Sequence, residues 1–185
     1  MTKIFYPLIL ILSILTATSC SNREKEFATE LQLLDSLAND LSAMEKWMIL
    51  DAKEIEQRYK QMEENTNYFK AHFKDTIYLE LALAFDQYNG AEPIYKNFIK
   101  HHAAIEKEHK ELTEQVKNLR HSLLKGEVTR PDFKVYYAKE SQETEALEEH
   151  VNDIYKKVLE IEPMYKRAAA VIDAEVASLR KKETK

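Results

Sequence analysis

The chain has 185 residues, of which 32 are acidic and 27 basic, giving a formal net charge of −5 at pH 7. We expect no nucleic-acid partner for such an acidic chain, because phosphate contacts require clustered lysine and arginine. Only two glycines and four prolines occur. With so few turn formers the chain must consist of long elements, which favours an all-α fold.

The first residues are typical of an export signal. Lys3 provides a positive charge, the stretch 4–15 is apolar except at Pro7 and Ser13, and small residues follow. A helix needs about 20 apolar residues to span a bilayer, and this stretch is shorter. We therefore expect residues 1–19 to be a signal peptide.

The motif at the end of this segment, Ala17-Thr18-Ser19-Cys20, resembles the lipobox of bacterial lipoproteins. The resemblance implies cleavage between Ser19 and Cys20, a diacylglycerol on the Cys20 thiol, and acylation of the freed amine. Two or three acyl chains anchor durably, since each buried methylene contributes about 0.8 kcal/mol. With Ser21 next, the sorting pattern of the family favours the outer membrane, facing the periplasm, over the inner membrane or the cell surface.

After the anchor, residues 20–26 form a short tether, and the remaining chain, 27–185, is predicted to be one helical-bundle domain. Apolar side chains recur at a spacing of three and four residues from Phe27 to Met62. This spacing predicts a long helix over about 24–64 with a coiled-coil-like seam.

The next predicted helix covers about 67–88 and is apolar all round, so we expect neighbours to cover it on several sides. Asn65-Thr66-Asn67 marks the expected turn before it. Asn89-Gly90 and Pro93 indicate a second boundary, because glycine suits the position after a helix and proline suits the first turn of the next. A third helix is predicted over about 91–125.

Gly126 is predicted to end that third helix, and the last helix is predicted over about 130–182. Apolar spacing continues across Pro163, which predicts a kink at this proline and not a terminus. Together these segments predict an elongated, up-and-down, antiparallel bundle of three to four long helices.

A cluster in the first predicted helix is a candidate partner-binding patch. It consists of Met44, Trp47, Met48, Ile49 and Leu50, which are apolar around most of a helix circumference. Trp and Met are enriched in interface cores. The alternative is that two neighbouring helices cover this stretch.

His102, Glu106 and His109 are the best candidates for a metal site. They share one face of a helix because they are spaced i, i+4 and i+7, and imidazole with carboxylate suits zinc, copper or iron. Carboxylate-bridged di-iron bundles need a second Glu-x-x-His motif, which this chain lacks. We therefore expect no metal and no other cofactor, with the histidines as partly buried bundle positions.

The chain has no phosphate-binding glycine loop, no Gly-x-Ser-x-Gly and no His-Glu-x-x-His. Cys20 is the only cysteine, and a lipidated thiol cannot act as a nucleophile. We therefore expect a non-enzymatic interaction or structural role at the cell envelope, with the bilayer and an envelope protein or a second copy as partners. A metal-binding bundle and a periplasmic chaperone or small-ligand binder remain alternatives.

Overall fold

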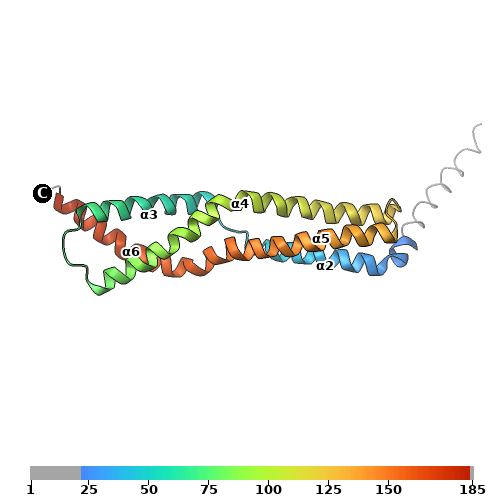
Figure 1. Ribbon diagram of the computed structural model, residues 1–185, viewed down its shortest axis with the longest axis horizontal. Helices are drawn as coiled ribbons and strands as arrows, with labels where there is room; N and C mark the ends of the chain where they lie inside the picture. Colours follow the sequence, from blue (N-terminus) through green and yellow to red (C-terminus); the bar gives the residue numbers. More distant parts are fainter. Residues whose placement is uncertain (1–21, 184–185) are drawn as a thin grey trace, which may run out of the picture. The chain divides into compact units, whose positions relative to one another are not determined.

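The computed structural model describes residues 22–183, and within this range the chain is helical without a strand (Figure 1). The all-α prediction is therefore confirmed. Residues 22–26 are helical, and the named elements follow in chain order: α2 Ala28–Met44, α3 Ala52–His72, α4 Leu79–Lys125, α5 Arg130–Val151, the π-helix η1 Asn152–Lys156, and α6 Lys157–Glu183. The predicted signal peptide, Ser19 and Cys20 lie outside the described residues.

The described chain divides into two compact units, where the sequence predicts a single domain. Unit 1 consists of residues 22–43 and 108–147, and unit 2 consists of residues 44–107 and 148–183. Helix α4 contributes to both units, because the division falls within it.

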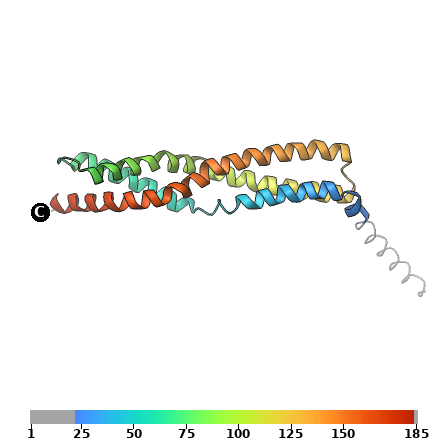
Figure 2. The ribbon, with the colours of Figure 1, turned by 90° about the horizontal axis from the view of Figure 1, so that it is seen from below.

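Unit 1 is a three-helix bundle. Helices α2 and α5 are parallel, and the C-terminal part of α4 is antiparallel to both (Figures 1 and 2). Its core is mainly aliphatic, and leucines supply most of it. The buried apolar residues are Phe27, Leu31, Leu34, Leu37, Leu41, Leu112, Val116, Leu119, Leu123, Phe133 and Leu147.

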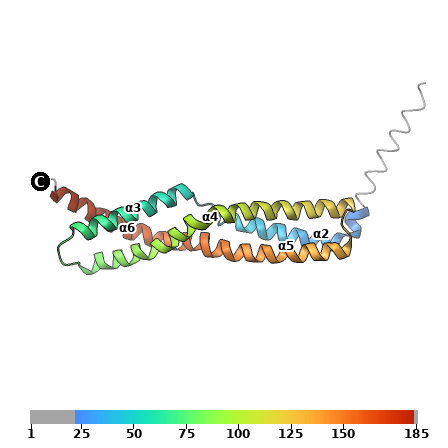
Figure 3. The ribbon, with the colours of Figure 1, turned by 45° about the horizontal axis from the view of Figure 1, so that its top comes forward.

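Unit 2 is also a three-helix bundle, made of α3, the N-terminal part of α4, and η1 with α6. Here α3 and α6 are parallel, and α4 is antiparallel to them (Figures 1 and 3). Its core contains more aromatic side chains than that of unit 1. The largest fully buried residues of unit 2 are Tyr88, Tyr95, Tyr155, Phe98, Ile55, Leu81 and Ile172.

The predicted long helix over 24–64 is wrong, because residues 45–51 separate α2 from α3. Asp51 begins α3 as its N-cap, and its side chain accepts hydrogen bonds from the backbone N–H groups of Lys53 at 2.9 Å and Glu54 at 3.4 Å. Such a cap satisfies N–H groups that have no partner inside the helix. The apolar spacing continues through a break of this kind.

The predicted turn at residues 65–67 is also wrong, because α3 continues to His72. Asn65 is buried and donates a hydrogen bond to Asp173 of α6 at 2.6 Å between Nδ2 and Oδ1. A polar side chain that would favour a turn is therefore satisfied by a neighbouring helix. The chain turns instead at residues 73–78.

The predicted boundary at residues 89–93 does not occur either, since α4 runs through Gly90 and Pro93. A glycine costs about 1 kcal/mol and a proline about 3 kcal/mol inside a helix. Burial offsets this cost, because Tyr88, Ala91 and Tyr95 are all fully buried along one face.

Residues 130–183 follow the predicted last helix closely, and the prediction that Pro163 is not a helix terminus is confirmed. Helix α6 continues through Pro163, and a π-helical segment, η1, comes before it. Ile154 and Tyr155 are adjacent and both buried. Both therefore face the core from the π-helical turn, where the backbone is wider than in an α-helix.

The end of α4 agrees with its prediction. Gly126 has a φ of 76°, in the left-handed region. Its N–H donates to the Leu123 carbonyl at 3.1 Å, and the Glu127 N–H donates to the Ser122 carbonyl at 2.9 Å. This pair of bonds is the Schellman motif, in which glycine carries no Cβ penalty.

Candidate partner-binding surface

The predicted patch at residues 44–50 lies mostly in the non-helical connection between α2 and α3. Met44 is buried, whereas Trp47 is 39% exposed and Ile49 is 72% exposed. The Lys156 Nζ lies 5.6 Å from the centroid of the Trp47 ring, so a cation covers part of the indole. Met44 therefore belongs to the core, and Trp47 and Ile49 are the exposed members of the predicted patch.

The two predicted histidine ligands each contact backbone carbonyl groups. The Nδ1 of His102 lies 3.1 Å from the Phe98 carbonyl oxygen and 3.2 Å from that of Ile99. The Nε2 of His109, which is buried in unit 1, donates to the Leu41 carbonyl at 2.9 Å. This bond satisfies a carbonyl in the last turn of α2, where helix carbonyls lack partners.

Glu106, the predicted carboxylate ligand, accepts a hydrogen bond from the Tyr155 hydroxyl at 2.9 Å. Among the residues that the structure describes, no group of three or more His, Cys, Asp or Glu side chains is placed to hold a metal ion. His102, Glu106 and His109 are thus engaged separately and are not brought together as a ligand set.

A different apolar surface lies at the start of α4. Ile77, Tyr78, Leu79 and Leu83 are between 48% and 76% exposed, although side chains of this size are usually buried. The residues lie close together in the chain, at the turn between α3 and α4. Together they expose more apolar surface than isolated apolar residues do, and contiguous patches of this kind mark interaction sites.

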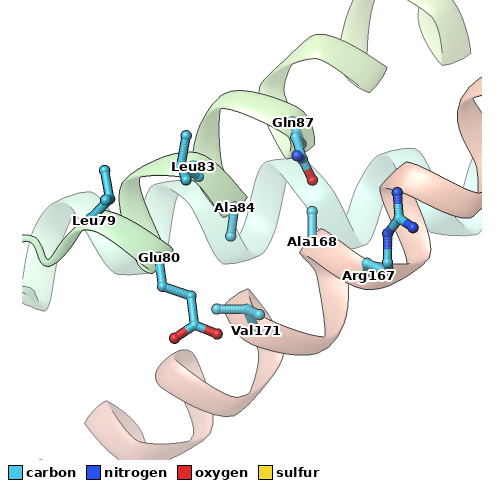
Figure 4. A pocket seen from close by; sticks show the side chains of 8 residues that line it. All are labelled: Leu79, Glu80, Leu83, Ala84, Gln87, Arg167, Ala168 and Val171. Carbon is cyan, nitrogen blue, oxygen red and sulfur yellow. The ribbon is translucent and has the colours of Figure 1, made fainter.

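This surface continues into a groove between α4 and α6, all within unit 2. The groove has a volume of 360 Å³. Figure 4 shows Ala84 and Ala168 between the two helices and Glu80 extending towards Val171. The lining residues are Leu79, Glu80, Leu83, Ala84, Gln87, Arg167, Ala168 and Val171.

Sequence reasoning missed this groove, because it predicted a helix over 67–88 covered on several sides. The polar run Lys74-Asp75-Thr76 was a signal for the connection at 73–78. Once the helix begins at Leu79, only one face of its first turns can meet α3 and α6. Leu81 and Ala84 occupy that face and are buried, while Leu83 is exposed.

A partly buried polar network centred on Glu162 lies in unit 2. The Tyr95 hydroxyl donates to the Glu162 Oε2 at 3.0 Å, and the Arg58 guanidinium forms an ion pair with the same carboxylate. Burial raises the pKa of Tyr95 above its ordinary value and raises the pKa of Tyr165 to about 12. Both hydroxyls therefore remain protonated at neutral pH and can serve as hydrogen-bond donors.

Comparison of the chain with protein-family models, curated proteins and solved structures finds no match. None of the helices in the described part of the chain is both long enough and apolar enough to cross a membrane.

Proposed function

We propose that the protein is a lipid-anchored lipoprotein of the cell envelope that binds an amphipathic helix of another envelope protein and catalyses no reaction. The anchor rests on the sequence Ala17-Thr18-Ser19-Cys20. The interaction rests on the groove between α4 and α6 and the exposed residues beside it, which we call the α4–α6 groove.

The observation that carries the proposal is the exposure of Leu79 at 76% and Leu83 at 54% beside an apolar groove of 360 Å³. Two packed helices present a groove of the kind that receives a third helix, as in helix-in-groove recognition. A bound helix would convert this side of unit 2 into a four-helix arrangement, which is a common stable packing.

Spacing and charge support a helical occupant. Leu79, Leu83 and Gln87 are four residues apart on α4, so they form one row along the groove. Glu80 and Arg167 also line it and carry opposite charges. An amphipathic helix has polar and charged residues beside its apolar stripe. Such residues can pair with Glu80 and with Arg167.

Site-specific photo-crosslinking in cells tests the groove. A crosslinking residue at Leu83 should capture one envelope protein, with the linked peptide in an amphipathic helix of that protein. Leu83→Glu, read out from a crosslinker at Leu79, should weaken capture at least tenfold, because burying a leucine contributes about 1.5–3 kcal/mol.

Val135→Glu is the matched control, because Val135 is an apolar residue of α5 in unit 1 that is 69% exposed. Capture should be unchanged in this variant. Linked peptides that come from a second copy of the chain, or equal loss of capture in both variants, would contradict binding of an envelope protein in the groove.

The anchor has its own test, since metabolic labelling with an alkyne fatty acid should modify the chain at Cys20. Cys20→Ser should abolish the label and release the protein from the membrane fraction. A wild-type chain that carries no fatty acid, or whose mature N-terminus lies elsewhere, would contradict the anchor without affecting the groove.

A further inference from the structure

A second cleft in unit 2 differs from the α4–α6 groove in its charge. It has a volume of 420 Å³, within the range of small-molecule sites. Its walls come from α4 on one side and from η1 and α6 on the other. The lining residues are Pro93, Ile94, Lys96, Asn97, Lys100, Asp153 and Lys157; we call this site the lysine cleft.

Three amines and one carboxylate line the lysine cleft. The Lys157 Nζ lies 2.8 Å from the Asp153 Oδ1, and this hydrogen bond lowers the pKa of Asp153, so the pair is charged at neutral pH. Lys96 and Lys100 form no ion pair within the described residues. The cleft is therefore positive, although the whole chain has a net charge of −5.

Lys96 and Lys100 are four residues apart on one helix, a placement that brings like charges together. Such a pair destabilises a helix by about 0.2–0.5 kcal/mol. An anion between the two amines would remove this repulsion and replace it with attraction.

The π-helix η1 forms part of the same cleft, because Asp153 belongs to it and Lys157 follows it directly. Relative to a regular α-helix, the wider turn rotates the following residues by about 100°. The π turn therefore determines where Lys157 faces. Since π-helical segments are rare and occur frequently at functional sites, this position is a second indication of a ligand.

We propose that the lysine cleft binds the phosphate ester of a small organic molecule or of a phospholipid headgroup. Lys96, Lys100 and Lys157 would hold the phosphate, since ammonium groups are compact donors to phosphate oxygens. The Asn97 amide adds a further donor. Pro93 and Ile94 would contact the carbon part of the ligand. This part would fill the volume of the cleft that the phosphate group does not occupy.

Amine-reactivity measurements on the full-length protein test this proposal. The protein is reconstituted in neutral phosphatidylcholine vesicles and acetylated for a short time, and the labelling rate of each lysine is measured by mass spectrometry. Glycerol phosphate at ten times its Kd should slow labelling of the three cleft lysines about tenfold, because about a tenth of the sites remain free. Vesicles that contain phosphatidylglycerol replace the soluble ligand in a parallel experiment.

Protection by soluble glycerol phosphate identifies a small organic phosphate, and protection only by phosphatidylglycerol identifies a lipid headgroup. Lys117 is the reference for general charge screening, because its side chain is 73% exposed and belongs to unit 1. Protection by neither probe, equal protection of Lys117, or protection by uncharged glycerol would overturn the proposal.

The variant Lys96→Gln/Lys100→Gln tests whether the three lysines bind one ligand together or are protected independently of one another. Glutamine forms helices well, so α4 should remain intact. Lys157 should lose its protection in this variant and keep it in Lys117→Gln. If Lys157 remains protected without the two α4 lysines, the three amines do not form one site.

Discussion

Unit 1 and unit 2 are both three-helix bundles, but the side chains that they bury differ in kind. Leucines dominate the core of unit 1, and a leucine needs no polar partner. Unit 2 buries four tyrosines, each of which carries a hydroxyl that needs a hydrogen bond when buried. These are Tyr88, Tyr95, Tyr155 and Tyr165.

One carboxylate in each unit, partly buried Glu162 in unit 2 and buried Glu140 in unit 1, differs in its hydrogen bonding. In unit 2, Glu162 accepts from Tyr95 and pairs with Arg58. In unit 1, Glu140 is buried, and its Oε2 has no hydrogen-bond partner in the structure. Unit 1 therefore retains a cost at Glu140 that it could lose by substitution, and unit 2 has one unpartnered buried group of its own, the Tyr88 hydroxyl.

The irregular backbone of the described chain is concentrated in unit 2. The connection at 45–51, the turn at 73–78 and the π-helix all lie there, as do the α4–α6 groove and the lysine cleft. Regular leucine packing leaves few openings between helices, whereas breaks expose side chains that a continuous helix would bury. Both proposed binding sites therefore lie in unit 2.

The largest expected effect concerns the leucine core of unit 1. Leu34→Ala should lower the free energy of unfolding by about 2–5 kcal/mol, because truncating a buried leucine leaves a cavity. Leu34 is 1% exposed, and its neighbour Leu33 is 38% exposed. Chemical denaturation should show a much smaller loss for Leu33→Ala, and similar losses in the two variants would contradict the assigned faces of α2.

The polar network of unit 2 gives the next largest effect. Glu162→Leu leaves the Tyr95 hydroxyl without its acceptor and Arg58 with one carboxylate fewer, so unfolding should become easier by about 2 kcal/mol. Glu162→Gln should lower the free energy of unfolding by less, because an amide oxygen still accepts hydrogen bonds. Denaturation of Glu160→Leu, an exposed position, provides the control, and a loss as large as that of Glu162→Leu would show that the network contributes little.

Substitution of Glu140 should raise the free energy of unfolding, whereas the two substitutions above lower it. Burial raises its pKa above the ordinary value of 4.5, so the folded state binds the proton more tightly than the unfolded state. Its contribution to stability therefore falls as the pH rises from 4.5 through the raised pKa. Glu140→Gln should gain on the order of 1 kcal/mol at neutral pH and should remove this part of the pH dependence.

Denaturation curves collected across that pH range check the prediction for unit 1. Glu145→Gln, an exposed position on the same helix, should leave both the stability and its pH dependence close to those of the wild type. A Glu140→Gln variant that is less stable than the wild type at neutral pH would mean that the carboxylate has a partner in solution.

Apolar spacing predicted the buried faces well wherever a helix is regular. Along the predicted third helix, residues spaced three and four apart from Ala91 to Leu123 are buried at nearly every position, including His109. Spacing alone cannot place breaks, since its period continues across them. Asp51 and Glu54 have the spacing of a capping box, a local signal that the prediction did not use.

The binding sites were less predictable than the fold, because they depend on residues brought together from distant parts of the chain. Lys100 and Lys157 line one cleft only because α4 packs against η1 and α6. No pattern within either segment marks them. The π turn has a weak signal, two consecutive buried residues at Ile154 and Tyr155, which is evident only once their burial is known.

The smallest effect compares the two glycines, one in each unit. Gly90 lies inside α4 in unit 2, and an added Cβ would meet nothing within 4 Å. Gly90→Ala should therefore raise the free energy of unfolding by about 0.5–1 kcal/mol, through helix propensity and a less flexible unfolded chain. Gly126 in unit 1 has a φ of 76°, and an added Cβ would collide with the Arg23 guanidinium. Gly126→Ala should lower the free energy of unfolding by about 1–2 kcal/mol. If denaturation showed a change of the same sign in both variants, an uninterrupted α4 would be contradicted.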